Sequence, residues 1–130
     1  MTGELDKLEI RPDAAELARM RDFVRANASR YGLDDAVRFR ALLVATEAVT
    51  NAIRHGRSEG DRPIAIRCLA DEHGFTIEVG DRGRFHHRAP SRPEDTGGRG
   101  LGLIERFSRR FDLETSEQGT TLRMVLAEAA

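Results

Sequence analysis

Two pairs of alternating segments constrain the fold of this chain more than any other feature. Residues 64–70 and 75–79 alternate apolar and polar side chains, with a short polar turn between them. Residues 111–116 and 120–126 form a second such pair around Gly119. Alternation over about four to eight residues, interrupted by a turn, is typical of a β-hairpin. The sequence therefore predicts two hairpins in a sheet that is mainly antiparallel, or mixed.

Helix signals occupy much of the remaining sequence. Asp13 is a suitable N-cap for one helix, and Asp34 or Asp35 can open another. Gly32 and Gly56 are natural residues for the ends of these two helices. The elements expected outside the hairpins are a short strand at 8–11, stopped by Pro12, and helices at about 13–30, 34–56 and 101–110.

The order of these elements indicates the fold class. Paired strands that are separate from the helices favour an α+β fold, in which helices pack on one face of an antiparallel sheet. We expect one domain spanning 1–130, built as a two-layer α+β sandwich with three helices on one face, and not a doubly wound parallel sheet. The third helix is expected to bury Ile104, Phe107 and Phe111. Residues 82–98 lack periodicity and should form a long loop, which in a small domain is usually functional or mobile.

Composition narrows the class of protein. The 130 residues include 39% hydrophobic and 33% charged residues, as in a soluble globular domain. The net charge of −1 gives no overall basic field, so neither nucleic acid nor a membrane is an expected partner. Cys68 is the only cysteine, which excludes an intramolecular disulfide and predicts a small core residue. No signal peptide or membrane-spanning run is visible, so we expect a cytoplasmic protein.

The segment 47–56 is the first candidate for chemistry, because Glu47, Asn51 and His55 are spaced four residues apart. On an α-helix this spacing gives about 40° around the axis and roughly 6 Å along it, so the three side chains share one side. Such a polar stripe is expected to face a wet cleft that holds a ligand. A solvated helix face is the alternative, and His55 also suits a helix C-terminus when charged. The apolar residues expected on the opposite side are Leu42, Ala45, Val49, Ala52 and Ile53.

Two further motifs contain glycine. Asp81 and Gly83 directly follow an alternating segment, so the carboxylate lies at a strand end, where it can accept a hydrogen bond from an exocyclic amine. An ordinary turn is the alternative. Glycines at 97, 98, 100 and 102 surround Arg99 and open the third helix. Glycine-rich backbone at a helix start suits phosphate, although a flexible hinge would also explain it.

In this order the motifs resemble the Asn box and the two Gly boxes of the GHKL ATPase superfamily, which includes gyrase and histidine kinases. The matching residues are Glu47-x-x-x-Asn51, Asp81-x-Gly83 and Gly98-x-Gly100-x-Gly102. The resemblance covers essentially the whole chain and implies the Bergerat ATP-binding fold. Within the superfamily the chain is most similar to the bacterial anti-sigma-factor serine kinases of partner-switching systems.

The resemblance also implies roles for individual residues. Asn51 would ligate Mg²⁺ on the ATP phosphates, and Glu47 would act as base toward a serine hydroxyl. Asp81 would read adenine with Gly83 beside the base, and residues 84–96 would form a lid. Residues implied to contact the nucleotide elsewhere are His55, Gly98, Arg99, Gly100, Leu101, Gly102 and Thr121, the last on the strand that closes the adenine pocket.

The implied partners are a STAS-domain anti-sigma antagonist, which accepts the phosphate, and a competing sigma factor. A homodimer is also implied. Two other functions remain open: a nucleotide-binding interaction module with little or no kinase activity, and a histidine-kinase catalytic domain that acts in trans. Phe85 stands where the family often has glycine, which favours a stiffer or displaced lid hinge. His86 and His87 are either a metal site or solvated, and Arg106, Arg109 and Arg110 either a solvated face or a partner contact.

Overall fold

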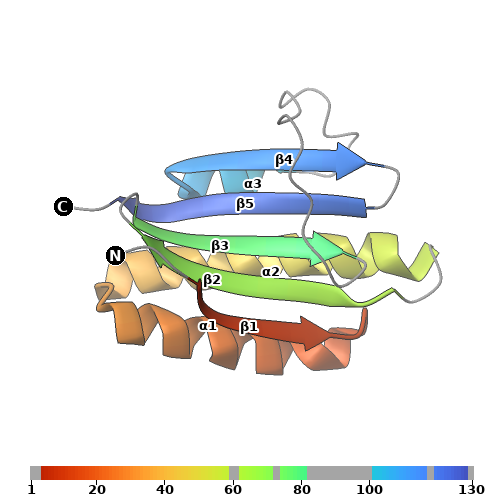
Figure 1. Cartoon of the computed structure of the whole chain (residues 1–130), viewed down its shortest axis with the longest axis horizontal. Coiled ribbons are helices and arrows are strands. Elements are labelled where there is room, and N and C mark those ends of the chain that lie inside the picture. Colours follow the sequence, from red (N-terminus) through yellow and green to blue (C-terminus); the bar gives the residue numbers. More distant parts are fainter. Residues whose placement is uncertain (1–3, 59–61, 72–73, 82–100, 117–118, 129–130) are drawn as a thin grey trace.

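The computed structural model describes residues 4–58, 62–71, 74–81, 101–116 and 119–128. In these residues five strands form one sheet with the order β1-β2-β3-β5-β4, and every neighbouring pair is antiparallel. Both predicted hairpins are present, β2–β3 and β4–β5 (Figure 1). The strands are β1 (Glu4–Ile10), β2 (Ile64–Asp71), β3 (Gly74–Asp81), β4 (Arg110–Ser116) and β5 (Gly119–Glu128).

Helices cover one face of this sheet, as Figure 1 shows. The α+β two-layer architecture is therefore confirmed. Met20 and Val24 from the first helix and Val44 and Val49 from the second are fully buried, and so are Ile66, Ile77 and Met124 from the strands. The core lies between the two layers. The helical elements are a 3₁₀ turn η1 (Ala14–Glu16), α1 (Leu17–Tyr31), α2 (Asp35–Ser58) and α3 (Gly102–Phe107).

Local chemistry sets the helix boundaries. The Asp13 side chain accepts a hydrogen bond from the N–H of Ala15 at 2.9 Å, which caps the 3₁₀ turn that precedes α1. Gly32 ends α1 with φ 84°, in the left-handed region that glycine adopts at helix ends. Asp34 accepts from the N–H of Val37 at 2.9 Å and is the N-cap of α2.

Several predicted boundaries differ from the structure. The first strand starts at Glu4 and ends at Ile10, before Arg11, because it pairs with most of β2. The helix α2 continues past Gly56 to Ser58, since one glycine weakens a long helix by only about 1 kcal/mol. A 3₁₀ turn precedes α1.

A further difference concerns α3, which ends at Phe107 rather than near Arg110. Ser108 is extended, and the N–H of Arg109 donates to Val125 at 2.7 Å, which brings the chain into the sheet. Phe111 therefore lies on β4, and both Phe111 and Phe107 are only half-buried, whereas Ile104 is fully buried as predicted.

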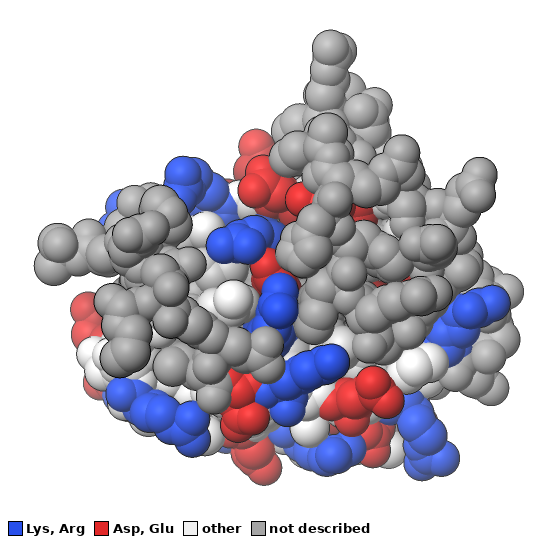
Figure 2. All heavy atoms as spheres, in the orientation of Figure 1, with Lys and Arg blue, Asp and Glu red and all other residues white. Residues whose placement is uncertain are grey.

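The sheet face away from the helices carries a buried carboxylate. Glu78 on the central strand β3 is 1% exposed and pairs with Arg67 on β2 and Arg123 on β5. Arg67 donates to one carboxylate oxygen at 2.9 Å and Arg123 to the other at 2.8 Å. Figure 2 shows charges of both signs interspersed on this face. Glu78 thus links three adjacent strands through side chains.

Candidate functional site

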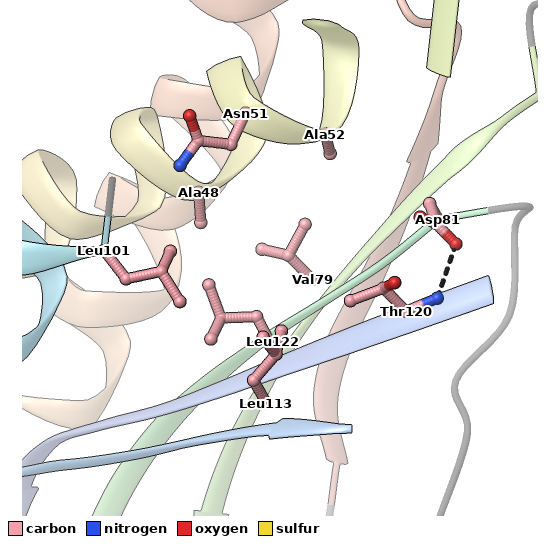
Figure 3. Close-up of a pocket in the computed structure, with 9 residues that line it drawn as sticks. All are labelled: Ala48, Asn51, Ala52, Val79, Asp81, Leu101, Leu113, Thr120 and Leu122. Carbon is pink, nitrogen blue, oxygen red and sulfur yellow. Dashed lines mark hydrogen bonds between the residues drawn. The ribbon is translucent and has the colours of Figure 1, made fainter. Parts of the chain in front are cut away.

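A cavity lies between α2, the start of α3 and the ends of β3 and β5 (Figure 3). Its volume is about 30 Å³, which holds about one water molecule. A larger ligand can therefore enter only if these walls move apart. The residues that line it are Ala48, Asn51, Ala52, Val79, Asp81, Leu101, Leu113, Thr120 and Leu122.

Asn51 is the polar residue that α2 contributes to this cavity. It is 5% exposed, and its Oδ1 accepts a long hydrogen bond of 3.4 Å from Arg54. Its Nδ2 is buried and has no hydrogen-bond partner among the described residues. An unpaired buried polar group destabilises a protein by about 1–3 kcal/mol. The described part of the fold therefore gives this amide donor no acceptor, which is typical of a group that binds a ligand.

Asp81 stands on the opposite wall as the last residue of β3. One of its carboxylate oxygens accepts a hydrogen bond from the backbone N–H of Thr120 at 2.8 Å, drawn in Figure 3. This bond ties the end of β3 to the start of β5 and fixes the carboxylate at the cavity. The second oxygen has no hydrogen-bond partner in the described part of the chain, so it can accept a hydrogen bond from a ligand.

The rest of the lining is apolar. Val79, Leu113 and Leu122 come from three adjacent strands and point to the helix side of the sheet, where Leu101 and two alanines of α2 meet them (Figure 3). Apolar walls with a few polar groups are typical of a site for a flat organic ring. Sequence reasoning missed these strand residues and Ala48, because alternation identifies a core face but not which core residues border a cavity.

Glu47 lies on α2 four residues before Asn51, and it is half-buried but does not line the cavity. It makes no hydrogen bond or ion pair with a described residue. The predicted division of α2 into opposite polar and apolar sides is partly wrong. Ala45, Val49 and Ile53 are buried, but Ala52 lines the same cavity as Asn51. The polar stripe thus borders the apolar face of the helix rather than opposing it.

Thr121 was the predicted contact from the last strand, but the structure brings its neighbour to the cavity. Thr121 pairs with Gly80, and strand alternation directs it to the sheet face away from the helices. Thr120 lines the cavity and carries the N–H that Asp81 binds. The sequence offered two adjacent threonines, and only the register of the strand distinguishes them.

The phosphate-binding motif is described only in part. Leu101 lines the cavity, and Gly102 is the first residue of α3. A Cβ added to Gly102 would meet no atom within 4 Å, so the fold itself leaves room for a side chain there. The predicted residues Gly83, Gly98, Arg99 and Gly100, the proposed lid at 84–96, His86 and His87, and the side chain of His55 lie outside the described residues.

The described residues could bind a metal ion only together with a ligand that supplies further oxygen atoms. In the described residues, no three side chains of histidine, cysteine, aspartate or glutamate gather into a metal site. Asn51 offers a neutral oxygen, and Mg²⁺ is commonly bound through few protein groups plus the phosphates of a substrate. Cys68 is not a ligand candidate, because burial raises the pKa of its thiol to about 12.

Comparison with protein families gives a match. A family model described as "Histidine kinase-like ATPase domain" matches residues 10–126, which includes every described residue of the cavity. No curated protein matches the sequence significantly. Among the described helices, none combines the length and the apolar character that crossing a membrane requires.

Proposed function

The chain belongs to the histidine kinase-like ATPase family, and on that premise we propose that it is a Mg·ATP-dependent serine/threonine kinase that also acts as an anti-sigma factor. The proposed phosphate acceptor is a serine or threonine of a STAS-domain antagonist. A sigma factor is the competing partner, and the kinase works as a homodimer. ATP binding follows from the family, whereas the kinase activity, the magnesium and the partners are proposals.

One observation supports the proposal most directly. The amide of Asn51, whose Nδ2 has no partner among the described residues, and the carboxylate of Asp81 stand on opposite walls of one apolar cavity. We infer that the walls of this cavity move apart to take the adenine ring, with Asp81 accepting from the exocyclic amine. The Oδ1 of Asn51 would hold the magnesium, which would neutralise phosphate charge, and the Nδ2 can donate to an oxygen of the nucleotide. Glu47 lies about one helical turn before Asn51 on α2, and its carboxylate has no partner among the described residues, which suits a base toward a serine hydroxyl.

Nucleotide choice tests the role of Asp81. The carboxylate can accept from the adenine amine but not from the oxygen that guanine carries at the same ring position. We therefore expect the protein to bind Mg·ATP more tightly than Mg·GTP in calorimetric titrations. Asp81→Asn should reduce this preference at least about tenfold, because the amide can donate to guanine. Equal affinity of the wild-type protein for the two nucleotides would contradict this assignment.

Phosphate transfer tests the kinase. Incubation with γ-labelled ATP, Mg²⁺ and a STAS protein encoded beside this chain should give phosphoserine or phosphothreonine. Glu47→Gln should abolish transfer while Mg·ATP still binds, because the amide cannot accept the hydroxyl proton. Glu9→Gln, which changes an exposed carboxylate on β1, is the matched control and should leave transfer unchanged.

Two alternatives make different predictions in the same assay. A nucleotide-binding interaction module would capture the STAS partner without ever phosphorylating it. A histidine-kinase catalytic domain acting in trans would give phosphohistidine on another protein, and that phosphate is labile in acid whereas phosphoserine is stable. Acid treatment of the labelled product therefore separates the two kinase chemistries.

A further inference from the structure

A second cavity lies at the other end of the molecule and carries three arginines. Its lining residues are Arg40, Arg106, Phe107, Ser108, Arg109 and Leu126, and its volume is about 350 Å³. Arg40 precedes Asn51 by eleven residues on α2, which is about 16 Å along the helix axis. Leu126 likewise lies near the far end of β5 from Thr120. The two cavities are therefore separate sites.

The three arginines of this cavity differ in their charge balance from five arginines that are ion-paired elsewhere in the described structure. Arg19, Arg25, Arg38, Arg67 and Arg123 all form ion pairs with carboxylates. Arg40, Arg106 and Arg109 form none with any described residue, although Arg106 stacks on the ring of Phe107 at 5.4 Å. Three guanidinium groups from two distant segments thus share a cavity without a counter-charge from the described part of the fold. Their mutual repulsion is relieved when an anion binds between them.

We propose that this cavity is a binding site for a phosphate group, separate from the nucleotide site. A guanidinium offers a planar fork of donors that matches phosphate or carboxylate oxygens. A single carboxylate has two oxygens, which is too few for three such forks, whereas a terminal phosphate has three. The hydroxyl oxygen of Ser108, which lies between Phe107 and Arg109, is buried and also lacks a partner among the described residues. Phe107 and Leu126 supply an apolar wall for the organic part of a phosphate ester.

The site can be tested without nucleotide, residue by residue. Pyrophosphate is titrated into the ¹⁵N-labelled full chain, and backbone amide shifts are followed by NMR. We expect saturable shifts at residues 105–109 that are independent of any shifts at 48–52, which border the nucleotide cavity. Arg40→Gln, Arg106→Gln and Arg109→Gln should each weaken the binding measured at 105–109 by about tenfold or more.

The matched control is Arg19→Gln, which removes the same charge from α1, where Arg19 pairs with Glu16 at 3.0 Å. It should leave the affinity unchanged. The proposal is overturned if pyrophosphate shifts nothing at 105–109, or if Arg19→Gln weakens binding as much as the three cavity variants do. It is also overturned if glutarate, a dicarboxylate, binds these residues more tightly than pyrophosphate. Well-dispersed spectra of the variants establish that each is folded.

Discussion

At the scale of single residues, the amide of Asn51 is expected to lower the stability of the fold while it serves nucleotide binding. Its buried Nδ2 has no partner among the described residues, so the folded protein carries an unsatisfied polar group. Replacement by leucine removes this group at similar volume. We expect Asn51→Leu to leave the free energy of unfolding unchanged or to raise it by up to about 2 kcal/mol, while Mg·ATP binding is lost. Urea unfolding and calorimetric titration measure the two effects.

Asn27 provides the comparison for this variant. It is 1% exposed on α1 and does not line the nucleotide cavity. Its Nδ2 donates to the carbonyl of Phe23 at 3.0 Å, and its buried Oδ1 has no partner among the described residues. Asn27→Leu should retain Mg·ATP binding. If Asn51→Leu bound Mg·ATP as tightly as Asn27→Leu does, Asn51 would not contact the nucleotide.

Cys68 gives a pH-dependent prediction at the same scale. Burial raises the pKa of its thiol from 9.0 to about 12, so the folded state favours the neutral thiol. This group therefore contributes stability that is complete below about pH 9 and is lost as the pH rises toward 12. Because the thiolate is the reactive form, alkylation by iodoacetamide at pH 8.5 should be slow in the folded protein and fast in urea. Equal rates in the two conditions would contradict the burial of this thiol.

At the scale of elements, Gly32 determines how α1 ends. Its φ is 84°, and its N–H donates to Ser29 at 3.0 Å. A Cβ at this position would meet nothing within 4 Å, so the cost of a side chain comes from the backbone conformation alone. We expect Gly32→Ala to lower the free energy of unfolding by about 1 kcal/mol and Gly32→Asn by less, because asparagine tolerates left-handed conformations. Urea unfolding of both variants gives the ranking, which the opposite order would refute.

The elements also show what the sequence could and could not predict. Alternation identified both hairpins, and Asp34 and Gly32 marked helix ends correctly, because these signals are local. The end of α3 was wrong because a tertiary bond, from Arg109 to Val125, directs the chain into the sheet. Ala52 was predicted on the side of α2 opposite Asn51, and Thr121 rather than its neighbour Thr120 was assigned to the nucleotide. Strand register and helix packing, rather than residue type, bring Ala52 and Thr120 to the cavity.

At the scale of the whole molecule, Glu78 connects the middle of the sheet. Its carboxylate is 1% exposed and binds arginines that are 20% and 35% exposed on the two flanking strands. Glu78→Gln removes the buried carboxylate charge that both arginines bind in the middle of the sheet. We expect the free energy of unfolding to fall by about 1–3 kcal/mol, less than for a fully buried pair because water reaches both arginines.

Glu16→Gln is the control for this variant, because it breaks a helix-surface pair with Arg19, whose side chain is 58% exposed. It should cost less than about 1 kcal/mol in the same urea unfolding experiment. If the two variants lost equal stability, the link across three strands would contribute no more than a surface pair.

The shortness of α3 has a consequence for local opening. This helix has six residues, its N-cap makes no side-chain hydrogen bond, and Ile104 is its one buried residue. So short a helix is not stable by itself, and it can unfold locally while the sheet and α2 stay folded. In hydrogen–deuterium exchange, the amides of Glu105 and Ser108 should exchange through such openings, much faster than those of Val44 to Ala48. Since Leu101 and Arg106 border different cavities, a ligand in either cavity should slow exchange across the whole of α3.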